Sequence, residues 1–121
     1  NIPATLLRKL YVTGSLRNTE KGFEWTLQNT LAPTVIIGVG PVQVNGKTYS
    51  NETILLQTTK NPRPASLIKR QMPFHFSINQ QVRILVKGPP LSSGVHQLRM
   101  QLDTLEIGQV TIEAEDSLEA T

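Results

Sequence analysis

Apolar and polar residues alternate with a period of two along most of this 121-residue chain. In the segment GFEWTLQ, Phe23, Trp25 and Leu27 alternate with polar or charged neighbours. Successive side chains of a strand point to opposite faces of a sheet, so this pattern is typical of a strand with one buried face. The same alternation predicts three later strands, over residues 82–87, 97–102 and 109–115.

Turn residues divide the remaining β-prone segments. The continuous β-branched run TVIIGV, residues 34–39, predicts a strand buried on both faces, which Gly40 and Pro41 are expected to end. Asn45-Gly46 stands between two β-prone flanks, and these two residue types best tolerate the positive φ angles of a type I′ turn. A tight hairpin is therefore predicted at residues 42–49, and a further strand follows within residues 51–59.

Residues 60–73, KNPRPASLIKRQMP, do not follow the strand pattern, because three prolines remove backbone donors and fix φ. The portion ASLIKRQ could form one helical turn. This is the longest irregular segment of the chain, and long loops in compact domains are often functional.

The number of short strands and the spacing of the turns predict an all-β protein, an antiparallel immunoglobulin-like β-sandwich of seven to nine short strands. A closed barrel is the alternative. The length suits one domain over residues 1–121, with residues 116–121 expected to form a frayed tail.

Composition narrows the classes of function. The chain has no cysteine, which excludes disulfides and thiolate chemistry and favours a cytoplasmic location. The sequence has neither a membrane-spanning apolar run nor the apolar stretch of a signal peptide. We expect no metal and no cofactor.

Charge is distributed in blocks, although the net charge is only +3. No acidic residue lies between Glu52 and Asp103, and no lysine or arginine follows Asp103. Such blocks are expected to attract each other between neighbouring strands, or else across an interface between subunits or with a partner protein. The basic part lacks interleaved aromatic residues, so a nucleic-acid partner is not expected.

The irregular segment and the strand after it supply the candidate binding residues for a ligand or an acidic partner: Lys60, Arg63, Lys69, Arg70 and His75. The alternative is a solvated loop with no binding role. His75 alternates with two phenylalanines and should point outward. His96 shares the parity of the apolar residues after it, so we expect it to be buried and bonded to turn backbone groups.

No pattern indicates catalysis. The two histidines are too far apart in sequence for a paired metal motif, and no G-x-S-x-G motif is present. No residue is therefore assigned a catalytic or metal-binding role, although a small enzyme using His96 or His75 with carboxylates stays open. The single tryptophan, Trp25, is expected to be a core residue, with a sugar-stacking platform of Trp25, Tyr11 or Tyr49 as the alternative.

Three stretches, GSLRNTEKGF at 14–23, VQVNGKTY at 42–49 and LSSGVHQLRMQL at 91–102, resemble the small β-sandwich beta subunits of the C-glycoside deglycosidase family. The resemblance implies a subunit that works beside a larger, barrel-shaped alpha subunit, which carries the metal and most of the chemistry. It assigns no catalytic residue to this chain.

These observations favour a non-catalytic interaction module or accessory subunit, either homo-oligomeric or paired with a larger enzyme, which the resemblance implies would act on carbohydrates. A carbohydrate-binding or small-ligand-binding module is the alternative.

Overall fold

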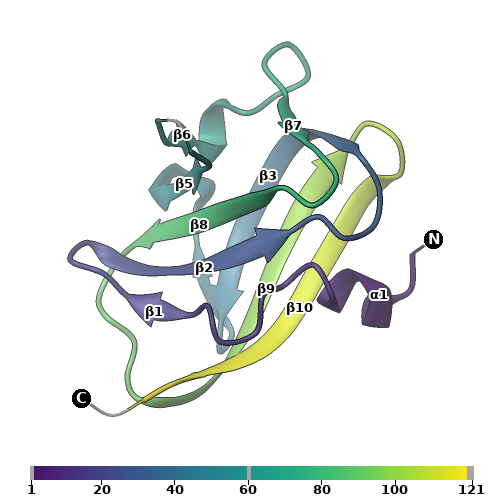
Figure 1. The fold of residues 1–121 in the computed structure, drawn as a ribbon. Coiled ribbons are helices and arrows are strands. Elements are labelled where there is room, and N and C mark those ends of the chain that lie inside the picture. The colour runs from purple at the N-terminus through teal and green to yellow at the C-terminus, as the bar shows by residue number, and fades with distance from the viewer. Residues whose placement is uncertain (1, 60, 120–121) are drawn as a thin grey trace.

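The computed structural model describes residues 2–59 and 61–119, which form two antiparallel sheets that enclose one core (Figure 1). The first sheet has the order β1 (Arg17–Asn18), β2 (Gly22–Gln28), β8 (Gln81–Lys87), β5 (Ile54–Gln57) and β6 (Arg63–Pro64). The second has the order β10 (Gly108–Leu118), β9 (Gly94–Thr104), β3 (Thr34–Val44) and β4 (Lys47–Tyr49), and β7 (Phe74–Phe76) also pairs with β3. The helical elements are α1 (Ala4–Arg8) and two 3₁₀ turns, η1 (Asn51–Thr53) and η2 (Ala65–Leu67).

The prediction of an all-β chain built from alternating strands is confirmed. Phe23, Trp25 and Leu27 of β2 are buried, and the ring of Phe23 lies 5.3 Å from that of Tyr49 in the opposite sheet. The structure describes ten strands, more than the seven to nine expected, because it includes the two-residue strands β1 and β6. Both sheets are open in their strand order, so the chain does not form the closed barrel considered as the alternative.

The hairpin predicted at Asn45-Gly46 is confirmed. Both residues have positive φ, 52° and 84°, and Val44 pairs with Lys47 across the turn. Local chemistry favours this feature, since Asn and Gly are among the few residue types that adopt the required backbone angles at low cost.

The expectation that Gly40 and Pro41 end a strand is wrong. β3 runs through both residues, and its pairing with β9 shifts register between Val39 and Val42. Such an irregularity leaves a residue outside the regular ladder, so proline is tolerated inside the strand. The run 34–39 is also not buried on both faces, because only Ile36 and Val39 are fully buried within it.

The tail expected at residues 116–121 is wrong for Asp116 to Leu118, which are the last residues of β10 and pair with His96 to Gly94 of β9. Residues 120 and 121 lie outside the described residues. In the part of the chain that the structure describes, no helix has the length and apolar character needed to span a membrane.

Candidate functional site

The irregular segment, residues 61–73, is here called the basic loop and lies between β5 and β7. It includes the two-residue strand β6, which pairs with β5 and which the sequence pattern did not predict. Only η2 is helical in it, so the helical turn expected over residues 65–71 is limited to a short 3₁₀ turn. Ala65 and Ile68 are buried and attach the loop to the core. Lys60, the first predicted binding residue, lies outside the described residues.

Arg63 holds the basic loop together. Its guanidinium donates hydrogen bonds to the backbone carbonyls of Pro73 (3.0 Å) and Met72 (3.1 Å), and it lies 5.9 Å from the ring centre of Phe74. These contacts use two of its donors and one planar face inside the protein. Arg63 therefore positions the loop, and its half-buried side chain is not a free cation.

Lys69 and Arg70 lie at the tip of the loop and are exposed. Reciprocal backbone hydrogen bonds between Lys69 and Met72, of 3.2 and 2.9 Å, close this tip into a tight turn. Leu67 and Met72, on either side of the two cations, are 56% and 53% exposed. The structure thus brings two cations and two long apolar side chains together on one ordered loop.

The two histidines have different environments, and both point as expected. His75 is exposed on β7 between the buried Phe74 and Phe76. It pairs with Val35 of β3 in the backbone register and follows the basic loop closely in sequence. In residues 2–59 and 61–119, its side chain belongs to no cluster of groups that could hold a metal ion.

His96 is buried and uses both ring nitrogens. Nε2 lies 2.7 Å from the carbonyl oxygen of Ser92, which can only accept, so Nε2 carries the proton. Nδ1 then accepts from the side-chain amide of Asn45 at 2.8 Å, while the Asn45 carbonyl accepts from the Gln97 N–H at 2.9 Å. The prediction of a buried, bonded histidine is confirmed, and His96 joins the β3–β4 turn to the start of β9.

The aromatic residues considered for a sugar-stacking platform are buried. Trp25 is 2% exposed, and Tyr11 and Tyr49 are 7% and 9% exposed. Stacking on a sugar requires an accessible ring face. The core interpretation of Trp25 is confirmed.

The charge blocks are mostly separated between the two sheets. The basic residues Arg83 and Lys87 lie on β8, whereas the acidic residues Glu113 and Glu115 are exposed on β10 of the other sheet. Among the described residues, Arg99 of β9 is the only cation that faces an acid of the second block in register, Glu113. The expectation that the blocks lie on neighbouring strands is therefore wrong for most of the cations.

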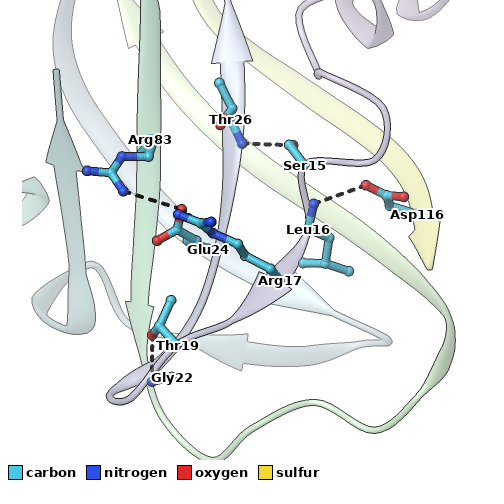
Figure 2. A network of polar contacts seen from close by, with 9 residues as sticks. All are labelled: Ser15, Leu16, Arg17, Thr19, Gly22, Glu24, Thr26, Arg83 and Asp116. Atoms are coloured by element: carbon cyan, nitrogen blue, oxygen red, sulfur yellow. Dashed lines mark hydrogen bonds and ion pairs between the residues drawn. The ribbon is translucent and has the colours of Figure 1, made fainter. Parts of the chain in front are cut away.

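The ion pairs of the described residues converge instead on Glu24 of β2, the second strand in the order of the first sheet (Figure 2). Its carboxylate lies 3.0 Å from Arg17 Nε and 3.6 Å from Arg83, and its side chain is only 6% exposed. The two arginines come from the strands on either side of β2 and cover the carboxylate. This arrangement joins three strands but leaves no free carboxylate for acid–base chemistry.

Asp116 is a second buried acid, and the sequence interpretation missed its burial. One carboxylate oxygen accepts from the Tyr11 hydroxyl at 2.6 Å, from the Gly14 N–H at 3.0 Å and from the Leu16 N–H at 3.2 Å; the last contact is drawn in Figure 2. We call this group the Asp116 network. Asp116 has the parity of Ile112 and Ala114, which are buried, and that parity is the signal that could have revealed it.

Burial alone would raise the pKa of Asp116, but the hydrogen bonds from Tyr11, Ser117, Leu16 and Gly14 outweigh it and lower the pKa below its ordinary value. Burial, together with the hydrogen bond to Asp116, raises the pKa of Tyr11. The pair is therefore a neutral phenol and a carboxylate at neutral pH. The Tyr11 hydroxyl is bonded to Asp116, and the carboxylate also accepts from backbone donors, as expected for a structural role.

The fold and these sites define an all-β, two-sheet domain. In its described residues, the buried polar side chains are bonded internally. Those residues also include no group of three or more histidine, aspartate or glutamate side chains that could hold a metal ion. The family model of the hydroxymethylglutaryl-CoA reductase, N-terminal domain, matches residues 6–119. The chain belongs to this family. No curated protein matches the chain.

The family match corrects the resemblance to C-glycoside deglycosidase beta subunits, which is wrong. The three stretches that carried it include β1 and the turn into β2, the hairpin of β3 and β4, and the start of β9. Hairpins and strand entries of this kind recur in many two-sheet domains, because similar turn geometry selects similar residues. They indicated the architecture rather than the family.

Proposed function

We propose that this domain is a non-catalytic interaction module, an accessory domain to a catalytic unit of the hydroxymethylglutaryl-CoA reductase type. The family supports the association with an enzyme. The side chains of His96, Glu24 and Asp116 are occupied by hydrogen bonds or ion pairs within the domain. This supports the proposal that the catalytic residues belong to the partner and not to this domain. We propose that the basic loop contacts the partner.

The observation that carries this proposal is the composition of the loop tip. Leu67 and Met72 are more than half exposed, next to the exposed cations Lys69 and Arg70. Methionine and arginine are enriched at protein interfaces, where an apolar centre is combined with charges that select the partner. The turn between Lys69 and Met72 and the bonds of Arg63 order this surface before binding, which lowers the entropic cost of association. The complementary partner surface is acidic with an apolar centre.

A charge-reversal experiment tests this proposal. The double variant K69E/R70E changes two adjacent exposed cations at the loop tip, and R8E/K9E makes the same change at another exposed pair, at the end of α1. Each protein is mixed with the reductase catalytic unit and measured by isothermal titration calorimetry and light scattering at low and high salt. We expect the loop variant to weaken the complex by about tenfold or more, the control to leave it near wild type, and salt to weaken the wild-type complex.

Equal binding by wild type and K69E/R70E would refute the role of the loop, and no complex at tens of micromolar would refute the accessory function.

Self-association is the second candidate, favoured by the acidic outer residues of β10. Glu113 and Glu115 are exposed on this strand, which is at the end of the second sheet's strand order, and could meet the basic loop of another copy. Light scattering of the chain alone separates the two candidates. Salt-sensitive dimers that are lost in K69E/R70E favour self-association, whereas a monomer that binds only the catalytic unit favours the accessory role.

We also propose that the two sheets form a sandwich of the immunoglobulin-like type. The orders β1-β2-β8-β5 and β10-β9-β3-β4 correspond to the ABED and GFCC′ orders of such domains, which supports this assignment. A cytoplasmic location is part of the proposal as well, supported by the absence of cysteine from the sequence.

A further inference from the structure

An apolar pocket of about 220 Å³ opens beside α1, close to the turn between β9 and β10. Figure 1 shows α1 lying alongside β10 at this side of the molecule. The walls come from α1 and from strands β3, β7, β9 and β10, and include Leu7, Leu10, Ile36, Phe76, Leu102 and Val110. All of these except Val110 are less than 9% exposed. The pocket is therefore a recess into the core and not a flat apolar surface.

The polar side chains in the wall are already bonded. The amide nitrogen of Asn29 donates to the carbonyl oxygens of Ala32 (2.7 Å) and Phe76 (2.9 Å). The hydroxyl of Thr104 donates to the Gly108 carbonyl at 2.8 Å. No buried side-chain polar atom in the described residues lacks a partner. A polar ligand would therefore find few groups to replace its bonds to water, and its burial would be unfavourable.

Among the described residues, the only charged one in the wall is Glu106, which is exposed and accepts a hydrogen bond from the Val35 N–H at 3.2 Å. No lysine, arginine or histidine among the described residues lines the pocket. A carboxylate at the opening repels anions and offers nothing to neutralise them. Charge thus selects against acidic ligands, and the apolar wall selects against polar ones.

We propose that this pocket binds a small neutral apolar molecule, about the size of a substituted benzene ring. An apolar cavity of about 150 Å³ lined by leucine, isoleucine and phenylalanine stays dry and binds benzene in another protein, and the present pocket exceeds that size with similar walls. Binding is stabilised by burial of the apolar surface of the ligand against the pocket wall and requires no specific hydrogen bond. This binding site is independent of the basic loop and of the proposed accessory function.

Benzyl alcohol and benzoate are suitable probes, because they have similar shapes and differ in charge. Binding is followed through the ¹³C-methyl NMR signals of Ile36, Leu102 and Val110, compared with those of the exposed Leu67. We expect saturable shifts of the three pocket methyls with benzyl alcohol, and binding of benzoate weaker by about tenfold. The substitution Glu106→Gln should narrow the difference between the two probes.

Filling the pocket provides the matched test. Val110→Phe adds volume to the wall, whereas Val95→Phe makes the same change at a position that is 62% exposed and outside the pocket. We expect V110F to weaken benzyl alcohol binding by more than about tenfold and V95F to leave it unchanged. Ala32→Leu, at an exposed position in the wall, narrows the opening without altering the core and should also weaken binding, so the test does not depend on V110F folding.

Three outcomes would overturn the proposal. The first is the absence of saturable shifts at the pocket methyls up to the solubility limit of benzyl alcohol. The second is binding that V110F and A32L leave unchanged, which would place the probe elsewhere. The third is a shift of the pocket methyls with protein concentration in the absence of probe, which would assign the pocket to a side chain of a second copy.

Discussion

The Asp116 network and the basic loop use charge in opposite ways. In the network, one buried carboxylate accepts hydrogen bonds from Tyr11, Gly14 and Leu16, and it attaches the N-terminal segment to the last strand. In the loop, Lys69 and Arg70 remain exposed to solvent on a turn that Arg63 supports. A buried charge with several partners stabilises one arrangement of the chain, whereas an exposed charge adds little stability and is available for a partner.

Asp116→Ala is expected to have the largest effect on stability. Removing the carboxylate leaves the Tyr11 hydroxyl and the Leu16 N–H buried without their acceptor, which should lower the free energy of unfolding by about 3 kcal/mol. Chemical denaturation followed by Trp25 fluorescence measures the free energy of unfolding. Glu113→Ala, at an exposed position on the same strand, is the control and should change stability by no more than about 0.5 kcal/mol. Equal losses in both variants would contradict a special role for Asp116.

The second prediction concerns pH. The pKa of Asp116 is lower in the folded protein than in the unfolded chain, so its stabilising contribution is fully present above about pH 4. It is lost as pH falls through the folded-state pKa, because protonation is more favourable in the unfolded chain. Denaturation curves from pH 7 to pH 2 should show this loss in the wild type. Asp116→Asn, which cannot titrate, should have a flatter profile below pH 4, and parallel profiles would exclude Asp116 as the cause.

His96→Ala should lower the free energy of unfolding by about 2 kcal/mol, because it deletes a buried ring and leaves the side chain of Asn45 without one partner. The other histidine offers a natural control, since His75 is exposed. His75→Ala should stay within about 0.5 kcal/mol of wild type. Both free energies of unfolding are measured by urea titration at neutral pH. A large loss of stability in His75→Ala would show that side-chain exposure does not predict the cost of substitution at these two positions.

The smallest expected effect on stability belongs to K69E/R70E. Among the described residues, the recorded ion pairs are both made by Glu24 and neither involves Lys69 or Arg70, so their reversal should change the free energy of unfolding by no more than about 0.5 kcal/mol. The same variant should lose the salt-sensitive association proposed above. A strongly destabilised variant would mean that the loop cations stabilise the fold and would remove the contrast with the Asp116 network.

Local chemistry was readable from the sequence, and long-range pairing was not. Asn45-Gly46 favours its turn through local backbone angles, and the parity of His96 correctly predicted that its side chain is buried. Pro41 misled, because its tolerance within β3 depends on a register shift against β9 that the local sequence does not show.

In the candidate site, too, local features could be predicted from the sequence and long-range contacts could not. An irregular basic segment was visible from its prolines and lysines, but the internal use of Arg63 depends on carbonyls nine and ten residues away. Asp116 was assigned to an acidic block by its charge, although its position two residues after Ala114 placed it on the buried face of β10. Its charge led to the wrong prediction of an exposed side chain, because the hydrogen-bond partners of Asp116 lie at the opposite end of the chain.

The hydrogen bond between Tyr11 and Asp116 joins residues 105 positions apart, which gives it a place in the order of folding. The hairpin of β9 and β10 can form from neighbouring segments, but the N-terminal segment can reach Asp116 only after the intervening strands have brought the chain ends together. Contacts that form after the rate-limiting step slow unfolding and leave the folding rate unchanged. We therefore expect the Asp116 network to determine how long the folded domain persists, and to have little influence on how quickly it forms.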